Sequence, residues 1–354
     1  MDLASLLLLI ASSSTTSSIT HGIPVAEETV LASAARLRGQ ARTAVPFSEG
    51  YTQLFGDSNL ALHGGGKRVH IVLDERTGAG FASQDAYLHG FFSARIKLPA
   101  AAYAAGVVAF YMSNGDVYEK THDELDFEFL GNIKRREWRV QTNVYGNGST
   151  LIRREERYSL WFDPTEDFFI VRTYKMPSPL FLRTQKFIAK QSCADLLASS
   201  MVVRIKSMGV QFPSKPMSLY ATIWDGFGWA TSGGRYKVKY KYAPFTAEFD
   251  DPMLDGYAAM DTLTSAPTCL LDNAGVRNAA AMSDGQRSAM ERIRTKHLTY
   301  GYCYDRLRYP TPLSECNVGD EAEMFLLTGL ARSRDQHGRS RHPRRGSSDS
   351  ALSL

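Results

Sequence analysis

The sequence lacks a strong net charge, which bears on the partners it can have. Its 354 residues carry a formal net charge of only +4. Residues 332–345 (RSRDQHGRSRHPRR) contain six arginines, so the remainder of the chain is close to neutral. Nucleic-acid-binding domains are typically basic over a whole face, and we therefore expect no nucleic-acid partner. We interpret residues 319–354 as a basic disordered tail, which either binds an acidic polymer or is simply solvated.

Long apolar runs are also missing. The longest candidate, residues 3–11 (LASLLLLIA), is too short to span a bilayer and resembles the apolar region of a secretory signal. It lacks a basic residue ahead of it and a clear cleavage site. We predict a signal peptide over residues 1–22, an alanine-rich linker over 23–45, a secreted protein and no membrane partner.

Cysteine is scarce, with four residues in the chain. Cys303 and Cys316 flank a short proline-containing segment, and in a secreted chain this spacing predicts a disulfide. Cys193 and Cys269 lie far apart, and their pairing is left open. Asn147 begins an Asn-Gly-Ser sequon, which is a glycosylation acceptor if the chain is secreted.

Helical patterns are rare, and strand-like patterns predominate. We expect one helix, over residues 283–297. Short runs bounded by Gly, Asn, Asp or Pro are typical of an all-β sandwich. The expected strands are residues 69–74, 91–98, 106–113, 124–131, 138–145, 216–224 and 235–245. Residues 168–206 show neither clean alternation nor clear turn signals.

The run HDELDFEFLG, residues 122–131, carries the strongest chemical signal. Successive strand residues point to opposite faces, so Glu124, Asp126 and Glu128 share one face while large apolar residues occupy the other. The apolar side belongs in the core, and the acidic side is expected to line a cleft. A calcium site or a solvated acidic face is the alternative interpretation.

Crowded carboxylates favour catalysis by glycoside hydrolysis. Like charges at close range raise at least one pKa, and a protonated carboxylic acid beside an ionised carboxylate is what that reaction requires. Polysaccharide clefts also need aromatic platforms. The segment IWDGFGWAT, residues 223–231, offers Trp224 and Trp229, which would otherwise be core residues.

Together with HDELDFEFLGN, several other segments resemble the plant xyloglucan endotransglucosylase/hydrolases of glycoside hydrolase family 16. These segments are YLHGFFSARIKLP, VVAFYMSNGD, EWRVQTNVYGNGS, SLWFDPTEDF, FPSKPMSLYATIWDG, WAT and YCYDRLRY. The resemblance implies an all-β, concanavalin-like β-jelly-roll sandwich over residues 46–250. It also implies a small helix-containing C-terminal extension over residues 251–318.

The resemblance implies roles for particular residues. Glu124 would be the nucleophile, Glu128 the acid/base and Asp126 a helper. Asn147 would be the glycosylation site, and Cys303 and Cys316 the second family disulfide. The substrate-binding residues would be Tyr111, His122, Gln141, Asn143, Trp224, Asp225 and Trp229. No cofactor or metal is implied.

The implied activity is retaining cleavage of xyloglucan and transfer to a second xyloglucan chain or to water, by a monomer in the cell wall and apoplast. Three departures from the family pattern qualify this expectation. One is the tail after Cys316, which differs from the family's usual ending. Residues 168–206 replace expected core strands and an expected tryptophan, and Tyr257 stands where a family cysteine would be. A non-catalytic glycan-binding jelly roll is therefore the alternative hypothesis.

Overall fold

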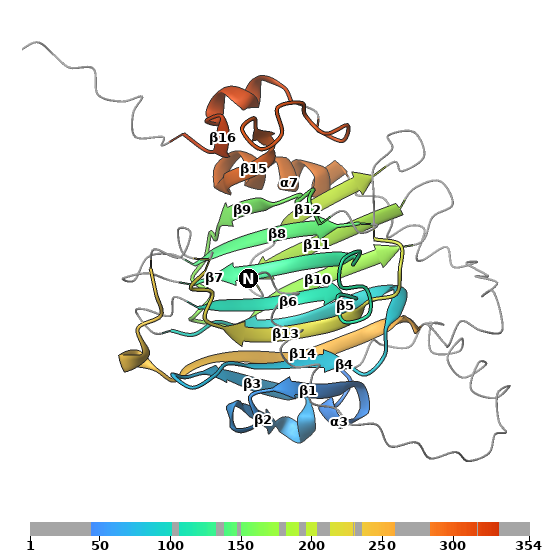
Figure 1. The fold of residues 1–354 in the computed structure, drawn as a ribbon, viewed down its shortest axis with the longest axis vertical. Coiled ribbons are helices and arrows are strands. Elements are labelled where there is room, and N and C mark those ends of the chain that lie inside the picture. The colour runs from blue at the N-terminus through green and yellow to red at the C-terminus, as the bar shows by residue number, and fades with distance from the viewer. Residues whose placement is uncertain are drawn as a thin grey trace, which may run out of the picture.

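Two antiparallel sheets stacked face to face form the body of the protein (Figure 1). The computed structural model describes residues 44–100, 106–131, 138–146, 150–176, 182–190, 196–203, 213–228, 230, 236–258, 284–316 and 318–332. All strand pairs in both sheets are antiparallel. The expected all-β jelly-roll sandwich is confirmed.

Within the described ranges, sheet A has nine strands and contains the acidic strand near its middle. Its order is β1 (Tyr51–Phe55), β4 (Ala79–Ser83), β13 (Ser218–Trp224), β6 (Val107–Ser113), β7 (Glu124–Leu130), β8 (Arg139–Tyr145), β9 (Glu156–Ser159), β15 (Leu298–Asp305) and β16 (Thr328–Leu330). The acidic strand, β7, is therefore hydrogen-bonded on both sides.

Sheet B covers the other side of the core. Over the same ranges its seven strands run in the order β12 (Leu196–Val203), β11 (Leu182–Lys190), β10 (Phe169–Met176), β5 (Tyr87–Lys97), β14 (Phe245–Ala258), β3 (Arg68–Leu73) and β2 (Leu60–His63). In the described parts of the chain the α-helices are α3 (Phe47–Gly50) and α7 (Asp284–His297), the second of which confirms the expected helix. Short 3-10 turns are η2 (Asp57–Asn59), η3 (Gly64–Gly66), η4 (Tyr240–Tyr242) and η5 (Asp320–Met324).

Aromatic side chains from the two sheets meet in the core. Phe129 of β7 contacts Phe169 of β10 edge to face, with ring centroids 5.2 Å apart. Phe81 of β4 makes a similar contact with Phe249 of β14, at 5.7 Å. Phe127 is buried in the same cluster. Edge-to-face pairs add roughly 0.5–1.5 kcal/mol each beyond the area they bury, so the apolar half of β7 helps to hold the sheets together.

Residues 168–206, where we expected missing core strands, include three strands of sheet B. In β10 the side chains of Phe169, Val171 and Thr173 are buried while Ile170 and Arg172 are less so. This alternation is hidden in the sequence because the outward positions include an apolar residue and because an inward position carries Lys175. For β10, the expectation that a core strand is absent was wrong.

The expectation of a strand over residues 235–245 was also wrong. From Tyr240 to Tyr242 the chain makes a 3-10 turn, and the amide of Ala243 donates to the carbonyl of Tyr240. The strand β14 begins only at Phe245, after Pro244, whose nitrogen cannot donate to a sheet. The alternating pattern lies partly in the segment ahead of this turn, where Val238 is buried between the exposed Lys237 and Lys239 although the segment is not a strand.

Strands from the C-terminal part of the chain pair with strands of the sandwich. The expected boundary at residues 250/251 falls inside β14, which continues through a bulge at Asp251 and keeps pairing with β5. At the other end of the molecule β15 pairs with β9, and α7 lies beside them (Figure 1).

The first part of the segment expected to be a disordered tail, residues 319–354, is folded, and residues 333–354 lie outside the described residues. Residues 320–324 form η5, and β16 pairs with β15. Burial of Phe325, whose ring stacks on Tyr304 at 4.0 Å, anchors this segment. The expected signal peptide (residues 1–22) and nearly all of the expected linker lie outside the described residues. No helix in the described parts of the chain is long and apolar enough to cross a membrane.

Truncating the apolar half of β7 should destabilise the fold. We expect Phe127→Ala to lower the free energy of unfolding by about 3–5 kcal/mol, because it leaves a cavity between the sheets. Leu62→Ala, at an exposed position on the edge strand β2, should change it by less than about 0.5 kcal/mol. Urea denaturation of both variants checks this, and equal losses would contradict the assignment of Phe127 to the core.

Candidate active site

The three acids of β7 lie on one face of sheet A. Leu125, Phe127 and Phe129 belong to the main core cluster, so alternation places Glu124, Asp126 and Glu128 on the opposite face. All three carboxylate side chains are buried. The apolar side chains of β7 therefore face the core and the acidic side chains face the opposite side of sheet A, as the sequence predicts.

The neighbouring strand β8 supplies an amide to two of the acids. In the antiparallel register Asn143 lies opposite Asp126 and Gln141 lies opposite Glu128. The Nδ2 of Asn143 donates to Oδ2 of Asp126 at 3.2 Å, and the Nε2 of Gln141 donates to Oε2 of Glu128 at 2.8 Å. Directly opposed residues share a face, so both contacts are a consequence of the register.

Arg157 on β9 orients the amide of Gln141. Its Nε and Nη2 donate to Oε1 of Gln141 at 3.1 and 2.6 Å. A guanidinium can only donate, so Oε1 must face Arg157 and the NH₂ group must face Glu128. The guanidinium also lies over the ring of Tyr300 on β15, 5.6 Å from its centroid. The C-terminal strand β15 thus supports a chain of contacts that ends at Glu128.

Glu128 has the proton affinity of a catalytic acid. Burial, the largest cause, and the nearby carboxylate of Asp126 raise its pKa from 4.5 to about 8. The hydrogen bond from Gln141 and the charge of Arg157 act in the opposite direction. The raised pKa keeps this carboxyl group protonated at neutral pH.

Glu124 lies at the start of β7 beside an aromatic and an imidazole side chain. The Nε2 of His122 is 3.8 Å from Oε2 of Glu124, and its Nδ1 is 3.2 Å from the carbonyl of Glu119. The ring of His122 packs edge to face on Tyr145, which lies opposite Glu124 on β8. The carboxylate of Glu124 therefore lies beside His122, just ahead of β7, and opposite Tyr145 of β8.

A stacked tyrosine pair continues the polar face on the other side of β7. Tyr111 of β6 lies opposite Asp126, and its ring stacks on Tyr220 of β13 with centroids 5.0 Å apart. Burial, with the nearby carboxylate of Glu124, raises the pKa of Tyr111 well above its usual value. The Tyr111 hydroxyl therefore remains protonated and able to donate.

In the segment 223–231, Trp224 lies on the polar face of sheet A and Asp225 lies in the turn that follows. Trp224 is half-buried and packs against Val107 and Leu130, which have the same facing as Glu128. Asp225 accepts a hydrogen bond from the hydroxyl of Tyr240 at 2.8 Å and from the amide of Phe227. Trp229 and Asn147 lie outside the described residues.

The structure therefore brings together the acids with Tyr111, His122, Gln141, Asn143 and Trp224. Sequence reasoning missed Arg157, Tyr220 and Tyr300. Each belongs to a strand that aligns with the site only through sheet order, and no local spacing links them to the acidic motif. None of the described residues form a cluster of three or more His, Cys, Asp or Glu side chains able to hold a metal ion.

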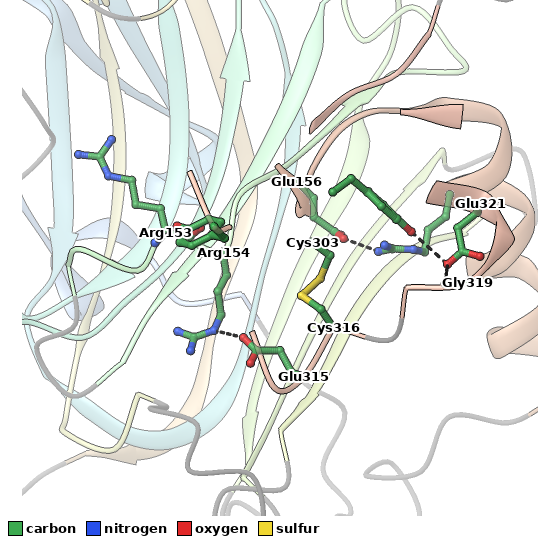
Figure 2. Close-up of a disulfide and its surroundings, with 11 residues drawn as sticks. Arg153, Arg154, Glu156, Cys303, Glu315, Cys316, Gly319 and Glu321 are labelled. Atoms are coloured by element: carbon green, nitrogen blue, oxygen red, sulfur yellow. Dashed lines mark hydrogen bonds and ion pairs between the residues drawn. A yellow bond between two sulfur atoms is a disulfide. The ribbon is translucent and has the colours of Figure 1, made fainter. Parts of the chain in front are cut away.

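The expected disulfide is present between Cys303 of β15 and Cys316 (Figure 2). Two ion pairs flank it. The Nε of Arg154 lies 2.6 Å from Oε1 of Glu315, and Nη1 of Arg294 lies 2.5 Å from Oε1 of Glu156. The first pair joins Glu315 to the segment that leads into β9, and the second joins α7 to β9. Cys193 and Cys269 lie outside the described residues.

Comparison with known proteins identifies the family. The model for glycosyl hydrolases family 16 matches residues 47–176 and 198–242, and that for the xyloglucan endo-transglycosylase C-terminus matches residues 272–316. Probable xyloglucan endotransglucosylase/hydrolase protein 28 of Arabidopsis thaliana is 55% identical over 276 residues, which cover 77% of this chain and 80% of that protein. The chain belongs to the xyloglucan endotransglucosylase/hydrolase family.

A second relative matches this chain over a similar length. Probable xyloglucan endotransglucosylase/hydrolase protein 27 of Arabidopsis thaliana is 56% identical over 273 residues, covering 77% of this family member and 79% of the relative. Among solved structures, a prokaryotic β-1,3-1,4-glucanase from a mouse hindgut metagenome has 21% identity and a TM-score of 0.46, covering 61% of this chain and 98% of its own.

The match also narrows the departure from the family pattern. The family 16 model breaks only over residues 177–197, rather than over the expected 168–206. The strand β10, which packs on β5 and on Phe129, falls inside the matched part. The unmatched stretch therefore starts after the strand that lies against the core.

Removing the Gln141 amide should raise the pKa of Glu128 further. That hydrogen bond stabilises the ionised carboxylate, so we expect Gln141→Leu to shift the titration of Glu128 to higher pH than in the unaltered protein. NMR of ¹³C-glutamate-labelled protein measures the shift. Thr142→Val, one residue along β8 and facing the core, should leave it unchanged. A lower pKa in Gln141→Leu would contradict the contact.

Proposed function

We propose that this protein cleaves the β-1,4-glucan backbone of xyloglucan with retention of configuration and transfers the cut chain to another xyloglucan chain or to water. The observation that carries the proposal is that Glu124 and a protonated Glu128 are buried on the same face of β7. Membership of the family and the names of the relatives identify the polysaccharide.

In the first step Glu124 acts as the nucleophile. Its carboxylate attacks the anomeric carbon, and Glu128 gives its proton to the departing glycosidic oxygen, so a glycosyl-enzyme forms as the second half of the chain leaves. The Cα atoms of these residues are about 13 Å apart at the usual strand rise. Side chains that lean toward each other can reach the roughly 5 Å carboxyl separation of retaining enzymes.

In the second step Glu128, now ionised, acts as the base. It accepts the proton of an acceptor hydroxyl, whose oxygen attacks the anomeric carbon and releases Glu124. A sugar hydroxyl gives transglucosylation and water gives hydrolysis. Asp126 lies between the two glutamates, and its charge, held by Asn143, helps to keep Glu128 protonated before the first step.

The substrate-binding roles follow from the residues around the acids. Trp224 offers an aromatic surface on the face of sheet A that carries Glu128, and sugar rings stack on such surfaces. Tyr111, His122 and Asn143 surround Glu124 and Asp126 with polar groups. We include Gln141, Asp225 and Trp229 in the proposed binding surface, although the contacts of Gln141 and Asp225 are with protein groups.

We further propose that the protein is secreted, acts as a monomer in the cell wall and apoplast, and is glycosylated at Asn147. The disulfide between Cys303 and Cys316 supports an oxidising compartment. The apolar run at residues 3–11 has the length of a signal segment.

Replacing the nucleophile should abolish turnover without abolishing binding. We expect Glu124→Ala to lower transfer of a labelled xyloglucan oligosaccharide into xyloglucan polymer by roughly 10³-fold or more. Affinity for xyloglucan should be retained, because the rest of the polar face is intact. Incorporation of label and electrophoretic retardation by the polysaccharide measure the two properties. Glu75→Ala, at an exposed carboxylate outside the sandwich strands, is the matched control.

The products separate the alternatives. Label in the polymer supports transfer, and shortening without label supports hydrolysis. Binding of xyloglucan by the unaltered protein without either product would support a glycan-binding module and overturn the proposal. Unaltered rates in Glu124→Ala would overturn the nucleophile assignment alone.

The pH dependence should report the proton on Glu128. The acid form is needed for the first step, and its pKa in the folded protein is about 8. We therefore expect kcat/KM to fall as the pH rises through about 8. In Glu128→Gln this alkaline limb should be absent from the residual activity. An alkaline limb near the ordinary glutamate pKa would contradict the raised value.

A further inference from the structure

A buried cluster of hydrogen-bonded residues holds the N-terminal end of β7 in place. Strand β6 ends at Ser113 and β7 begins at Glu124, and the residues just outside the two strands, Asn114 and Asp123, are bonded to each other. The amide of Asp123 donates to Oδ1 of Asn114 at 2.8 Å, and the amide of Asn114 donates to the carbonyl of Asp123 at 3.3 Å. Asn114 also donates from Nδ2 to the carbonyl of Pro216 at 2.9 Å.

The carboxylate of Asp123 binds the segment ahead of β13. Its Oδ2 accepts from the backbone amides of Ser214 and Lys215, at 2.7 and 2.8 Å. The residue is 0% exposed. A buried carboxylate is tolerated only when hydrogen bonds and charges compensate it, and two backbone donors are a strong arrangement for that purpose.

A buried lysine from sheet B completes the cluster. Lys175 of β10 is 1% exposed, and its Nζ donates to the carbonyl of Lys215 at 2.5 Å. Burial lowers the pKa of Lys175 to about 7, and the charge of Asp123 acts in the opposite direction. Lys175 is also the inward-facing residue that breaks the apolar pattern of β10. The cluster of Asn114, Asp123 and Lys175, here called the entry clamp, therefore joins β6, β7, the segment ahead of β13, and sheet B.

The entry clamp lies directly next to the proposed nucleophile, because Asp123 precedes Glu124 in the chain. All three acids are paired with residues of both β6 and β8, but Glu124 is the first residue of β7, whereas Asp126 and Glu128 lie inside the strand. Strand ends open more readily than strand centres. The same clamp residue, Asp123, separates His122 from Glu124, so its side chain anchors the backbone that carries both.

We propose that the entry clamp positions Glu124 for attack, with Asp123 as a positioning residue that acts through the backbone of β7. The inference rests on the proposed function, since it concerns the nucleophile of that reaction. By strand alternation the side chain of Asp123 points to the opposite face from that of Glu124, so Asp123 does not touch the substrate. Displacement of a reacting group by about 1 Å can cost about 100-fold in rate.

Kinetics of three variants test the proposal. We expect Asp123→Ala to lower kcat for transfer by about 10- to 100-fold while KM for xyloglucan changes little. Asp123→Asn should restore most of kcat, because an amide oxygen can still accept from Ser214 and Lys215. Asp250→Ala removes a buried acid on sheet B that is bonded to Arg68 and Arg95, and it should lower the melting temperature without lowering kcat.

The control separates positioning from stability. All rates are measured well below the melting temperature of each variant. Full kcat in Asp123→Ala, or an equal loss of kcat in Asp250→Ala, would overturn the proposal. Should Asp123→Ala not fold, Asn114→Ala removes two of the bonds, and full kcat in that variant would overturn it equally.

Hydrogen exchange supplies a readout that does not depend on activity. We expect the amides of Ser214, Lys215 and the first residues of β7 to exchange faster in Asp123→Ala and not in Asp250→Ala. Unchanged exchange with intact transfer would overturn the entry clamp and leave the proposed function standing. Absence of transfer in the unaltered protein would overturn the proposed function, and the positioning role with it, whatever the exchange rates.

Discussion

The hydrogen-bonded pairing of β7 with both β6 and β8 is the constraint on which the site depends. Because β7 is held on both edges, its register cannot slip without turning three carboxylates into the core and three large apolar side chains out of it. The apolar half packs against sheet B through contacts such as that of Phe129 with Phe169. The same packing that stabilises the sandwich thereby sets the direction of Glu124, Asp126 and Glu128.

The register also determines the chemistry of the carboxylates. Opposite Glu128 lies Gln141, and beyond it lies Arg157 on β9. Because the guanidinium of Arg157 donates to Oε1 of Gln141, the side-chain amide of Gln141 is held in one orientation. The ring of Tyr300 on β15 lies against the same guanidinium. The C-terminal strands thus complete the row of side chains that ends at the proposed acid/base. In the proposed mechanism, burial holds the proton on Glu128 for the first step, and the hydrogen bond from Gln141 and the charge of Arg157 stabilise the ionised form that the second step needs.

Part of this architecture can be predicted from sequence because it is local. The facing of the acids follows from alternation within one strand, the helix at Asp284–His297 from its length and basic end, and the disulfide from its spacing and context. Residues 235–245 were predicted to be a strand because polar and apolar residues alternate there. Buried and exposed side chains can also alternate in a segment that is not a strand, as around Val238. Strand β10 was missed because Lys175 occupies an inward position, and its partner group lies on a segment 40 residues away.

The residues that sequence reasoning did not find share a cause. Arg157 and Tyr300 reach the site through the order of strands in sheet A, and Lys175 reaches the entry clamp from the other sheet. Such neighbours are defined by sheet order and packing, which local periodicity does not encode.

Trapping of the glycosyl-enzyme tests the central claim most directly. The protein is incubated with an activated 2-fluoro glycoside of a xyloglucan oligosaccharide, which slows release of the covalent intermediate, and the labelled peptide is then sequenced by mass spectrometry. The account predicts a single sugar adduct on Glu124, absent from Glu124→Ala. An adduct on Asp126 or Glu128 would contradict the account, as would transfer activity in protein that acquires no adduct.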